Sequence, residues 1–328
     1  MVMALAFWGR KSKEYMQQIM KLFPLEEIDT VVDACMGSGS FSRNISCRLA
    51  DVKRIAIELD KSLVTMHQEI KNNSDKVIQK MLECSFSDEL YLYCRRITRE
   101  FNSEKASYDR IEIAFAELVL LYFSYNSMRG NVARRFDSYT KYDNEKKYNE
   151  AKYHLERVKN RFWLKAPSDV IDLSNKWQRL DIVNDSFINH TDLWENEKCW
   201  IYIDTPYELH KRGIIKEKVH NSGNLGYDVD MSTEEHELFV SRIIQYVTEE
   251  KLHAKMMICT NYELDEKGQI IVPKNDRYAR LLEYGFTRKL IEYKACSNTY
   301  ICTENSEGGA KRKRHRKIEA VYINYKTI

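Results

Sequence analysis

The sequence predicts an α/β fold with a mixed, mostly parallel sheet and a long helical insertion. Short apolar runs typical of buried strands end in glycine-rich or polar segments at two places far apart in the chain. Between these places, apolar residues recur at helical spacing, most clearly from Asp109 to Tyr125. A chain of 328 residues can bury one sizeable core and hold a smaller additional domain. We expect a core from residues 1–70 and 165–328, and a helical insertion over residues 71–164.

The first of these segments is a buried strand, Thr30 to Asp33, followed by the turn sequence Ala-Cys-Met-Gly-Ser-Gly-Ser-Phe. Glycine lets the backbone turn sharply and lets a ligand approach closely. A further strand, Arg54 to Ile57, ends at Glu58, about 20 residues after the glycines, where an acid can bind ribose hydroxyls. This succession of a strand, a glycine turn, a second strand and an acid predicts a Rossmann-like site for a nucleoside-bearing cofactor. A dinucleotide is the rival ligand, although Ser42 stands where its fingerprint has a third glycine.

The second segment is Asp204-Thr205-Pro206-Tyr207, which follows the apolar run Trp200 to Ile203. A carboxylate and a backbone carbonyl can accept both protons of an exocyclic amino group. Proline fixes its own φ near about −65°, and a tyrosine ring can stack on a base taken out of its duplex. The same four residues also suit an ordinary turn after a strand, so the motif alone leaves both interpretations open.

Together the two segments resemble the Dam-type (D12 class) adenine-N6 DNA methyltransferases, which use S-adenosylmethionine. The resemblance spans nearly the whole chain and implies a Rossmann-like methyltransferase core with an inserted helical target-recognition domain. The stretch Phe7 to Lys11 is similar to the family's N-terminal motif, and Glu58 falls where the family usually carries an aspartate. The cofactor-binding residues that the resemblance implies are Trp8, Lys11, Asp33, Gly37, Gly39, Phe41, Glu58 and Asp185.

The catalytic motif of that family is most often Asp-Pro-Pro-Tyr, whereas this chain has Thr205 at the second position. In the family that position contributes its backbone carbonyl, which threonine also supplies. The resemblance implies that Asp204 and the Thr205 carbonyl bind the target amine while Tyr207 stacks on the flipped base, with Pro206 completing the catalytic set. No strong general base is expected, because the methyl sulfonium is already an activated donor.

The segment from Asn126 to Lys141 resembles the stretch that lies beside the catalytic pocket against DNA in this family. Arginine can bond a guanine edge bidentately, and both Arg and Lys neutralise phosphates. A solvated loop is the alternative interpretation. The candidate contacts to double-stranded DNA are Asn126, Arg129, Asn131, Arg134, Arg135, Tyr139 and Lys141.

A basic run near the end of the chain precedes a predicted strand, Ile318 to Ile323. The pattern predicts a hairpin with a basic tip that binds phosphates through Lys311, Arg312 and Arg314. A nuclear import signal has the same composition, but a basic run joined to a late strand suits a phosphate-binding loop better in an enzyme that acts on DNA.

Two further elements are predicted on the way to that strand. The sequence Ser-Thr-Glu-Glu from Ser232 opens a helix with a capping box. The apolar positions of this helix that are expected to face inward are Leu238, Phe239, Ile243, Ile244 and Val247. Lys255 to Cys259 reads as another strand.

Composition narrows the class of protein without deciding it. The formal net charge of +3 is modest, so only the clustering of charge points to a nucleic acid. The eight cysteines form no Cys-x-x-Cys pair and the eight histidines lack metal-ligand spacing, so we expect no metal and no disulfide framework, and a reducing cytoplasm. The longest apolar helix is interrupted by Glu117, and no membrane span is expected.

Several activities remain open at this point. Cytosine C5 methylation is disfavoured, because the chain has no Pro-Cys pair to supply its nucleophile. N4-cytosine methylation tends toward serine where Asp204 stands. Adenine methylation in RNA and a catalytically inactive DNA-binding relative are compatible with the motifs, and an NAD-dependent oxidoreductase is the most distant alternative.

Overall fold

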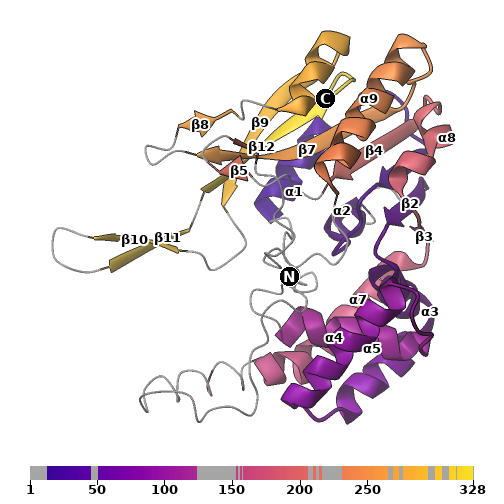
Figure 1. Cartoon of the computed structure of the whole chain (residues 1–328), viewed down its shortest axis with the longest axis vertical. Coiled ribbons are helices and arrows are strands. Elements are labelled where there is room, and N and C mark those ends of the chain that lie inside the picture. Colours follow the sequence, from indigo (N-terminus) through magenta and orange to yellow (C-terminus); the bar gives the residue numbers. More distant parts are fainter. Residues whose placement is uncertain are drawn as a thin grey trace.

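The computed structural model describes residues 13–45, 51–123, 153, 156, 158–205, 210–211, 214–215, 231–264, 269–272, 276–294, 300–304, 310–314 and 316–327. Its main sheet contains β1 (Thr30–Asp33), β2 (Lys53–Glu58), β3 (Leu180–Asn184), β4 (Cys199–Asp204), β7 (Lys255–Leu264), β8 (Ile270–Ile271), β9 (Thr287–Lys294) and β12 (Arg316–Ile323). The strands run in the order β3-β2-β1-β4-β7-β12-β9, and β8 pairs with β7. Figure 1 shows this sheet in the upper half of the view.

The pairing directions confirm a mixed, mostly parallel sheet. Strands β3, β2, β1, β4 and β7 pair in parallel, whereas β12 is antiparallel to both β7 and β9. The order differs from the 3-2-1-4-5-6 order of dinucleotide-binding folds, because the last strand is inserted next to the fifth core strand. Strand order reverses between β1 and β4, and such a switch point is where open α/β sheets bind ligands.

Helices and short helical turns of the described chain pack on the sheet or on one another. They are α1 (Lys13–Ile19), η1 (Met20–Leu22), α2 (Ser40–Ile45), α3 (Lys61–Glu83), α4 (Asp88–Asn102), α5 (Arg110–Phe123), η4 (Arg161–Lys165), α7 (Ala166–Trp177), η5 (Phe187–Asn189), α8 (Thr191–Trp194), α9 (Thr233–Thr248) and η6 (Arg277–Tyr284). Alternate side chains of a strand point to opposite faces. Accordingly, Val32 packs in a cluster with α8, α9 and η6, whereas Val31 packs in a cluster with α1 and α2.

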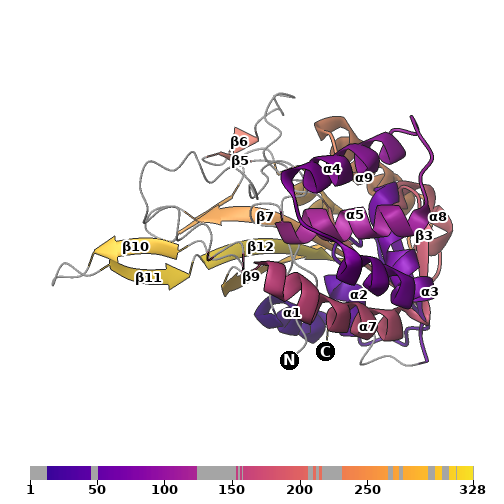
Figure 2. The same cartoon turned by 90° about the horizontal axis from the view of Figure 1, so that it is seen from below.

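The predicted helical insertion, residues 71–164, lies entirely within the connection between β2 and β3. Helices α3, α4, α5 and α7 share one hydrophobic cluster, which also includes Met36 and Ala56 of the sheet region. Figures 1 and 2 show these helices gathered together at one end of the molecule. Helix α3 runs past residue 71, where the predicted insertion begins, and Asn73 inside it has non-helical φ and ψ. The division into two domains stays a prediction.

The capping-box helix forms as predicted, but one of its five expected inward-facing residues, Leu238, is exposed. In α9, Ser232 Oγ accepts from the Glu235 amide at 3.1 Å, and the Glu235 carboxylate accepts from the Ser232 amide at 2.6 Å. Phe239 is 1% exposed, whereas Leu238 is 55% exposed. Adjacent helical positions lie about 100° apart, so a narrow contact with the sheet buries only one of the two.

The predicted hairpin near the end of the chain also forms, but its basic residues lie in one of its strands and not at its tip. Strands β10 (Tyr300–Glu304) and β11 (Ala310–Arg314) pair antiparallel, and both figures show the pair extending away from the main sheet. The prediction of a basic tip is wrong, because Lys311, Arg312 and Arg314 lie within the paired strand β11. A second small pair joins β5 (His210–Lys211) to β6 (Ile214–Ile215). In the described part of the chain, no helix has the length and apolar character needed to cross a membrane.

Candidate active site

The two segments singled out in the sequence meet at the switch point of the sheet. Asp33, the last residue of β1, pairs in register with Tyr202 of β4, and the Ala34 amide donates to the Tyr202 carbonyl at 2.9 Å. Asp204 therefore lies two residues beyond the partner of Asp33, at the same edge of the sheet. On its other side Asp204 is in register with Cys259 of β7. Strand pairing places the candidate cofactor turn beside the candidate catalytic motif.

The turn after β1 has the conformation for which glycine is suited. Gly37 has φ 47° and Gly39 has φ 68°, both in the left-handed region. Glu58 supports this turn from the end of β2. Its carboxylate accepts from the Gly37 amide at 2.8 Å and from the Asp60 amide at 3.0 Å. The acid expected to bind ribose thus lies in contact with the glycine turn.

Asp33 is a buried carboxyl group, and one of its two oxygen atoms accepts no hydrogen bond from the described residues. It is 2% exposed, and its Oδ2 accepts from the Ser42 amide at 3.1 Å and the Ser42 hydroxyl at 2.7 Å. Burial raises the pKa of Asp33 to about 7, against the lowering effect of these hydrogen bonds. Its Oδ1 is buried and has no hydrogen-bond partner among the described residues. A cationic or N–H donor on a bound ligand would fit this atom.

Phe41 and Asp185 are already engaged in local structure. The Phe41 ring is 3% exposed and stacks on Tyr202 with ring centroids 4.1 Å apart. Asp185 follows β3 and accepts from the Ser186 amide at 2.6 Å and from Asn189 at 2.9 Å. The hydrogen bond from Asn189 is the largest cause that lowers the pKa of Asp185. Contact of either residue with a cofactor stays a prediction.

Two residues that the sequence did not single out contact the glycine turn from behind. Trp177 Nε1 donates to His67 Nδ1 at 3.3 Å, and His67 Nε2 lies 2.8 Å from the Gly37 carbonyl oxygen. Both side chains are fully buried. Burial lowers the pKa of His67 to about 4, which keeps the imidazole neutral. No spacing rule indicates this contact, because His67 and Trp177 are 110 residues apart in the sequence.

The described chain contains only part of the predicted site. Asp204 is partly buried at the end of β4, and Thr205 is 4% exposed. The described ranges do not include Trp8, Lys11, Pro206 or Tyr207. They also do not include the DNA-contact candidates Asn126, Arg129, Asn131, Arg134, Arg135, Tyr139 and Lys141.

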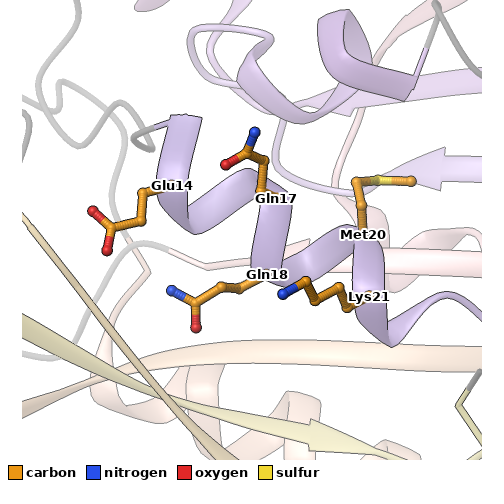
Figure 3. Close-up of a pocket in the computed structure, with 5 residues that line it drawn as sticks. All are labelled: Glu14, Gln17, Gln18, Met20 and Lys21. Carbon is orange, nitrogen blue, oxygen red and sulfur yellow. The ribbon is translucent and has the colours of Figure 1, made fainter.

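A surface hollow lies elsewhere, along α1 and η1. Figure 3 shows five described residues that line it, Glu14, Gln17, Gln18, Met20 and Lys21. The volume of the hollow is about 560 Å³. None of these five residues belongs to the predicted site, and we assign the hollow no function. The described residues hold no group of three or more His, Cys, Asp or Glu side chains that could ligate a metal ion.

Comparison with known families identifies the class of protein. The model of the D12 class N6 adenine-specific DNA methyltransferases matches residues 7–265, which include the N-terminal motif, the glycine turn and the catalytic motif. The chain belongs to this family. The resemblance drawn from the sequence is thereby confirmed, and adenine in DNA is the substrate of the family. This result disfavours the N4-cytosine, RNA and oxidoreductase alternatives, whereas an inactive relative remains untested.

The other comparisons add little. No curated protein has significant sequence similarity to the chain. A crystal structure of precorrin 8W decarboxylase from Methanobacterium thermoautotrophicum is 11% identical over 96% of this chain and 91% of that chain, with a TM-score of 0.34. Similarity at this level supports no argument about function, and the strand order itself is the evidence for the fold.

Proposed function

We propose that this protein transfers a methyl group from S-adenosylmethionine to adenine N6 within a short sequence of double-stranded DNA, after flipping the base. The observation that carries the proposal is the adjacency of the two motifs. Asp33 precedes the glycine turn, Asp204 opens the catalytic motif, and their strands pair directly at the switch point. A cofactor over the turn and an amine at Asp204 would therefore be neighbours, and proximity of this kind lowers the barrier to transfer.

The cofactor would be held by the glycine turn together with acids at the ends of three strands. Gly37 and Gly39 allow close approach of the backbone. Glu58 would bind the ribose, Asp185 the adenine of the cofactor, and the spare Oδ1 of Asp33 fits a donor such as the ammonium group. Trp8 and Lys11 would complete the set. When bound, S-adenosylmethionine supplies a methyl group on a sulfonium centre.

The target amine would be held by Asp204 and the backbone carbonyl of Thr205. The lone pair of adenine N6 is delocalised into the ring, and two acceptors around the NH2 favour the geometry in which that lone pair can attack. Asp204 and the Thr205 carbonyl would hold the amine so that its lone pair faces the methyl group that bound S-adenosylmethionine would supply, and the amine proton lost after transfer would pass to water. The base must leave the duplex to reach these groups, and the Tyr207 ring would then stack on it. Pro206 keeps the backbone rigid and offers no competing N–H donor.

The DNA would be bound by the segment from Asn126 to Lys141 and by strand β11. Contacts from Arg and Lys to phosphates position the duplex, whereas contacts to base edges select the sequence. Lys311, Arg312 and Arg314 all lie in β11, one strand of a hairpin that extends from the main sheet. We assign them to the phosphate backbone, because their closely spaced charges match its repeated charge.

The test is transfer of labelled methyl groups from S-adenosylmethionine to unmethylated duplex DNA by the purified chain, followed by nucleoside analysis. We expect label in N6-methyladenine, with much less transfer to an RNA of the same sequence. Label in N4-methylcytosine, or a preference for RNA, would contradict the proposed acceptor. Binding of S-adenosylmethionine without any transfer would instead indicate an inactive relative.

A further inference from the structure

The last residue of helix α7, Trp177, packs against the glycine turn at Gly39. A Cβ atom built on Gly39 would lie 2.7 Å and 2.9 Å from two atoms of the Trp177 ring. Carbon atoms do not approach this closely, so Trp177 leaves space for glycine alone at this position. Because Trp177 is fully buried, it has little freedom to move away. The shape of the turn thus depends on a residue from the far end of the helical connection.

The same tryptophan fixes the hydrogen bonding of His67. An indole N–H can only donate, so His67 Nδ1 is the acceptor and Nε2 carries the proton. That Nε2–H then donates to the Gly37 carbonyl at 2.8 Å, while the Gly37 N–H donates to Glu58 at 2.8 Å. Both backbone polar groups of Gly37 are therefore held by side chains, one from α3 and one from β2.

A second link joins α7 to the helix that follows the turn. Arg43 of α2 donates to Asp172 of α7 at 2.6 Å, and Lys176 also bonds Asp172 at 2.8 Å. The Arg43 side chain is 7% exposed, so this pair is largely shielded from water. Helix α7 contacts the turn at Trp177 and α2 at Asp172, and these contacts fix the turn on two sides.

We propose that His67 and Trp177 are positioning residues for the cofactor, which act by holding Gly37 and Gly39 in the conformation that binds S-adenosylmethionine. The inference rests on the proposed function, since it assigns the cofactor to this turn. Neither residue needs to touch the cofactor or the target base. Their loss would weaken cofactor binding and leave the chemistry at Asp204 intact once the cofactor is saturating.

The test measures the Kd for S-adenosylmethionine by calorimetry on the full chain, together with steady-state kinetics. His67→Leu removes the donor to Gly37 and leaves two buried polar groups unpaired, so we expect the Kd to rise by about fivefold or more. His67→Gln can donate to Gly37 and accept from Trp177, and it should restore most of the affinity. In both variants the KM for the cofactor should follow the Kd, while kcat stays within about twofold of wild type.

Trp177→Phe tests the donor side of the hydrogen bond between Trp177 and His67, and Trp194→Phe is its matched control. It removes the donor to His67, and the Kd should rise. Trp194 is also fully buried, but it packs against Phe239 on the opposite face of the sheet, and its Nε1 has no hydrogen-bond partner among the described residues. Trp194→Phe should lower thermal stability without changing the Kd.

The outcomes separate the inference from the proposed function. If the wild-type chain does not bind S-adenosylmethionine, the proposed function fails. Suppose that the wild-type chain binds, and that Trp177→Phe and His67→Gln have the same Kd as Trp194→Phe. If His67→Leu also has that Kd, or does not fold, the positioning role is wrong. A higher Kd in Trp177→Phe than in Trp194→Phe, with rescue by His67→Gln, supports it.

Discussion

The glycine turn after β1 and Asp204 at the end of β4 lie side by side, but different contacts support them. The turn is held by side chains from distant parts of the chain: Glu58, His67 and Trp177. Asp204 is placed by the register of β4 between β1 and β7, which is set by the strands themselves. The proposed cofactor side therefore depends on packing of distant side chains, whereas the proposed catalytic side depends on local sequence and strand pairing.

The largest effect is expected on the catalytic side. Asp204→Ala should lower methyl transfer by about 100-fold or more, because it removes an acceptor for the target amine. The Kd for S-adenosylmethionine should change by no more than a few fold. Transfer of labelled methyl groups and calorimetry check these two values. Asp181→Ala, at an exposed position of β3, is the control. A parallel loss of cofactor affinity in Asp204→Ala would mean that the two sides are not independent.

A pair of glycine substitutions tests whether packing holds the turn. Gly285 has φ 85°, and a Cβ added there would meet no atom within 4 Å, so Gly285→Ala should cost only the left-handed strain of about 1–2 kcal/mol. Gly39→Ala adds a clash with Trp177, and overpacking costs about 1–3 kcal/mol more. Urea denaturation measures both, and only Gly39→Ala should also weaken cofactor binding. Equal destabilisation by the two would remove Trp177 as a constraint on the turn.

The buried imidazole gives the cofactor side a dependence on pH. The pKa of His67 falls from 6.5 to about 4 on folding, so protonation favours the unfolded chain. Its contribution to stability is complete above pH 6.5 and is lost as the pH falls through about 4, at a cost on the order of 3 kcal/mol. When the pH is lowered from 7 to 4, the unfolding free energy of the wild-type chain should therefore fall by this amount relative to that of His67→Gln.

Asp33 titrates in the same range with the opposite sign. Its pKa rises from 3.8 to about 7 on folding, so its contribution to stability is present at low pH and is lost as the pH rises through about 7. Because Asp33 is present in both proteins, its effect cancels in the difference between wild type and His67→Gln. A difference that does not vary with pH would show that His67 is not buried as a neutral group.

The smallest effects are expected at the DNA contacts. Arg129→Ala should cost about 1–3 kcal/mol of binding and relax the target sequence if the residue reads a base edge. Lys311→Ala should weaken binding similarly for all sequences and lower the salt slope by about 1 if it contacts a phosphate. Binding titrations at several salt concentrations distinguish the two. Unchanged affinity and specificity in both variants would remove these residues from the interface.

The same division explains what could be predicted from sequence. Strand β1 was predicted at the residues where it forms, Thr30–Asp33, and Asp204 was correctly expected at the end of a strand, β4. Both signals are local, since an apolar run followed by a turn is written in adjacent residues. The contact of Trp177 with His67 joins two helices through tertiary packing, and no local pattern indicates it.

The errors have a similar physical cause. The basic residues were expected at the tip of a hairpin, because they follow a glycine-containing segment and lead into a strand, but Lys311, Arg312 and Arg314 pair within β11. Leu238 was expected to face the core, but the contact of α9 with the sheet leaves it exposed. In both cases the residue types allow either position, and only the tertiary arrangement decides. The domain division and the DNA contacts at Asn126 to Lys141 stay predictions.

Methylation of adenine by this protein is best tested by single-molecule sequencing of genomic DNA from a methylation-free host that expresses it. We predict N6-methyladenine in one discrete sequence motif, and its disappearance when Asp204→Ala replaces the wild-type chain at equal expression. An unmodified genome with a folded, expressed wild-type protein, or modification that persists in Asp204→Ala, would contradict this prediction.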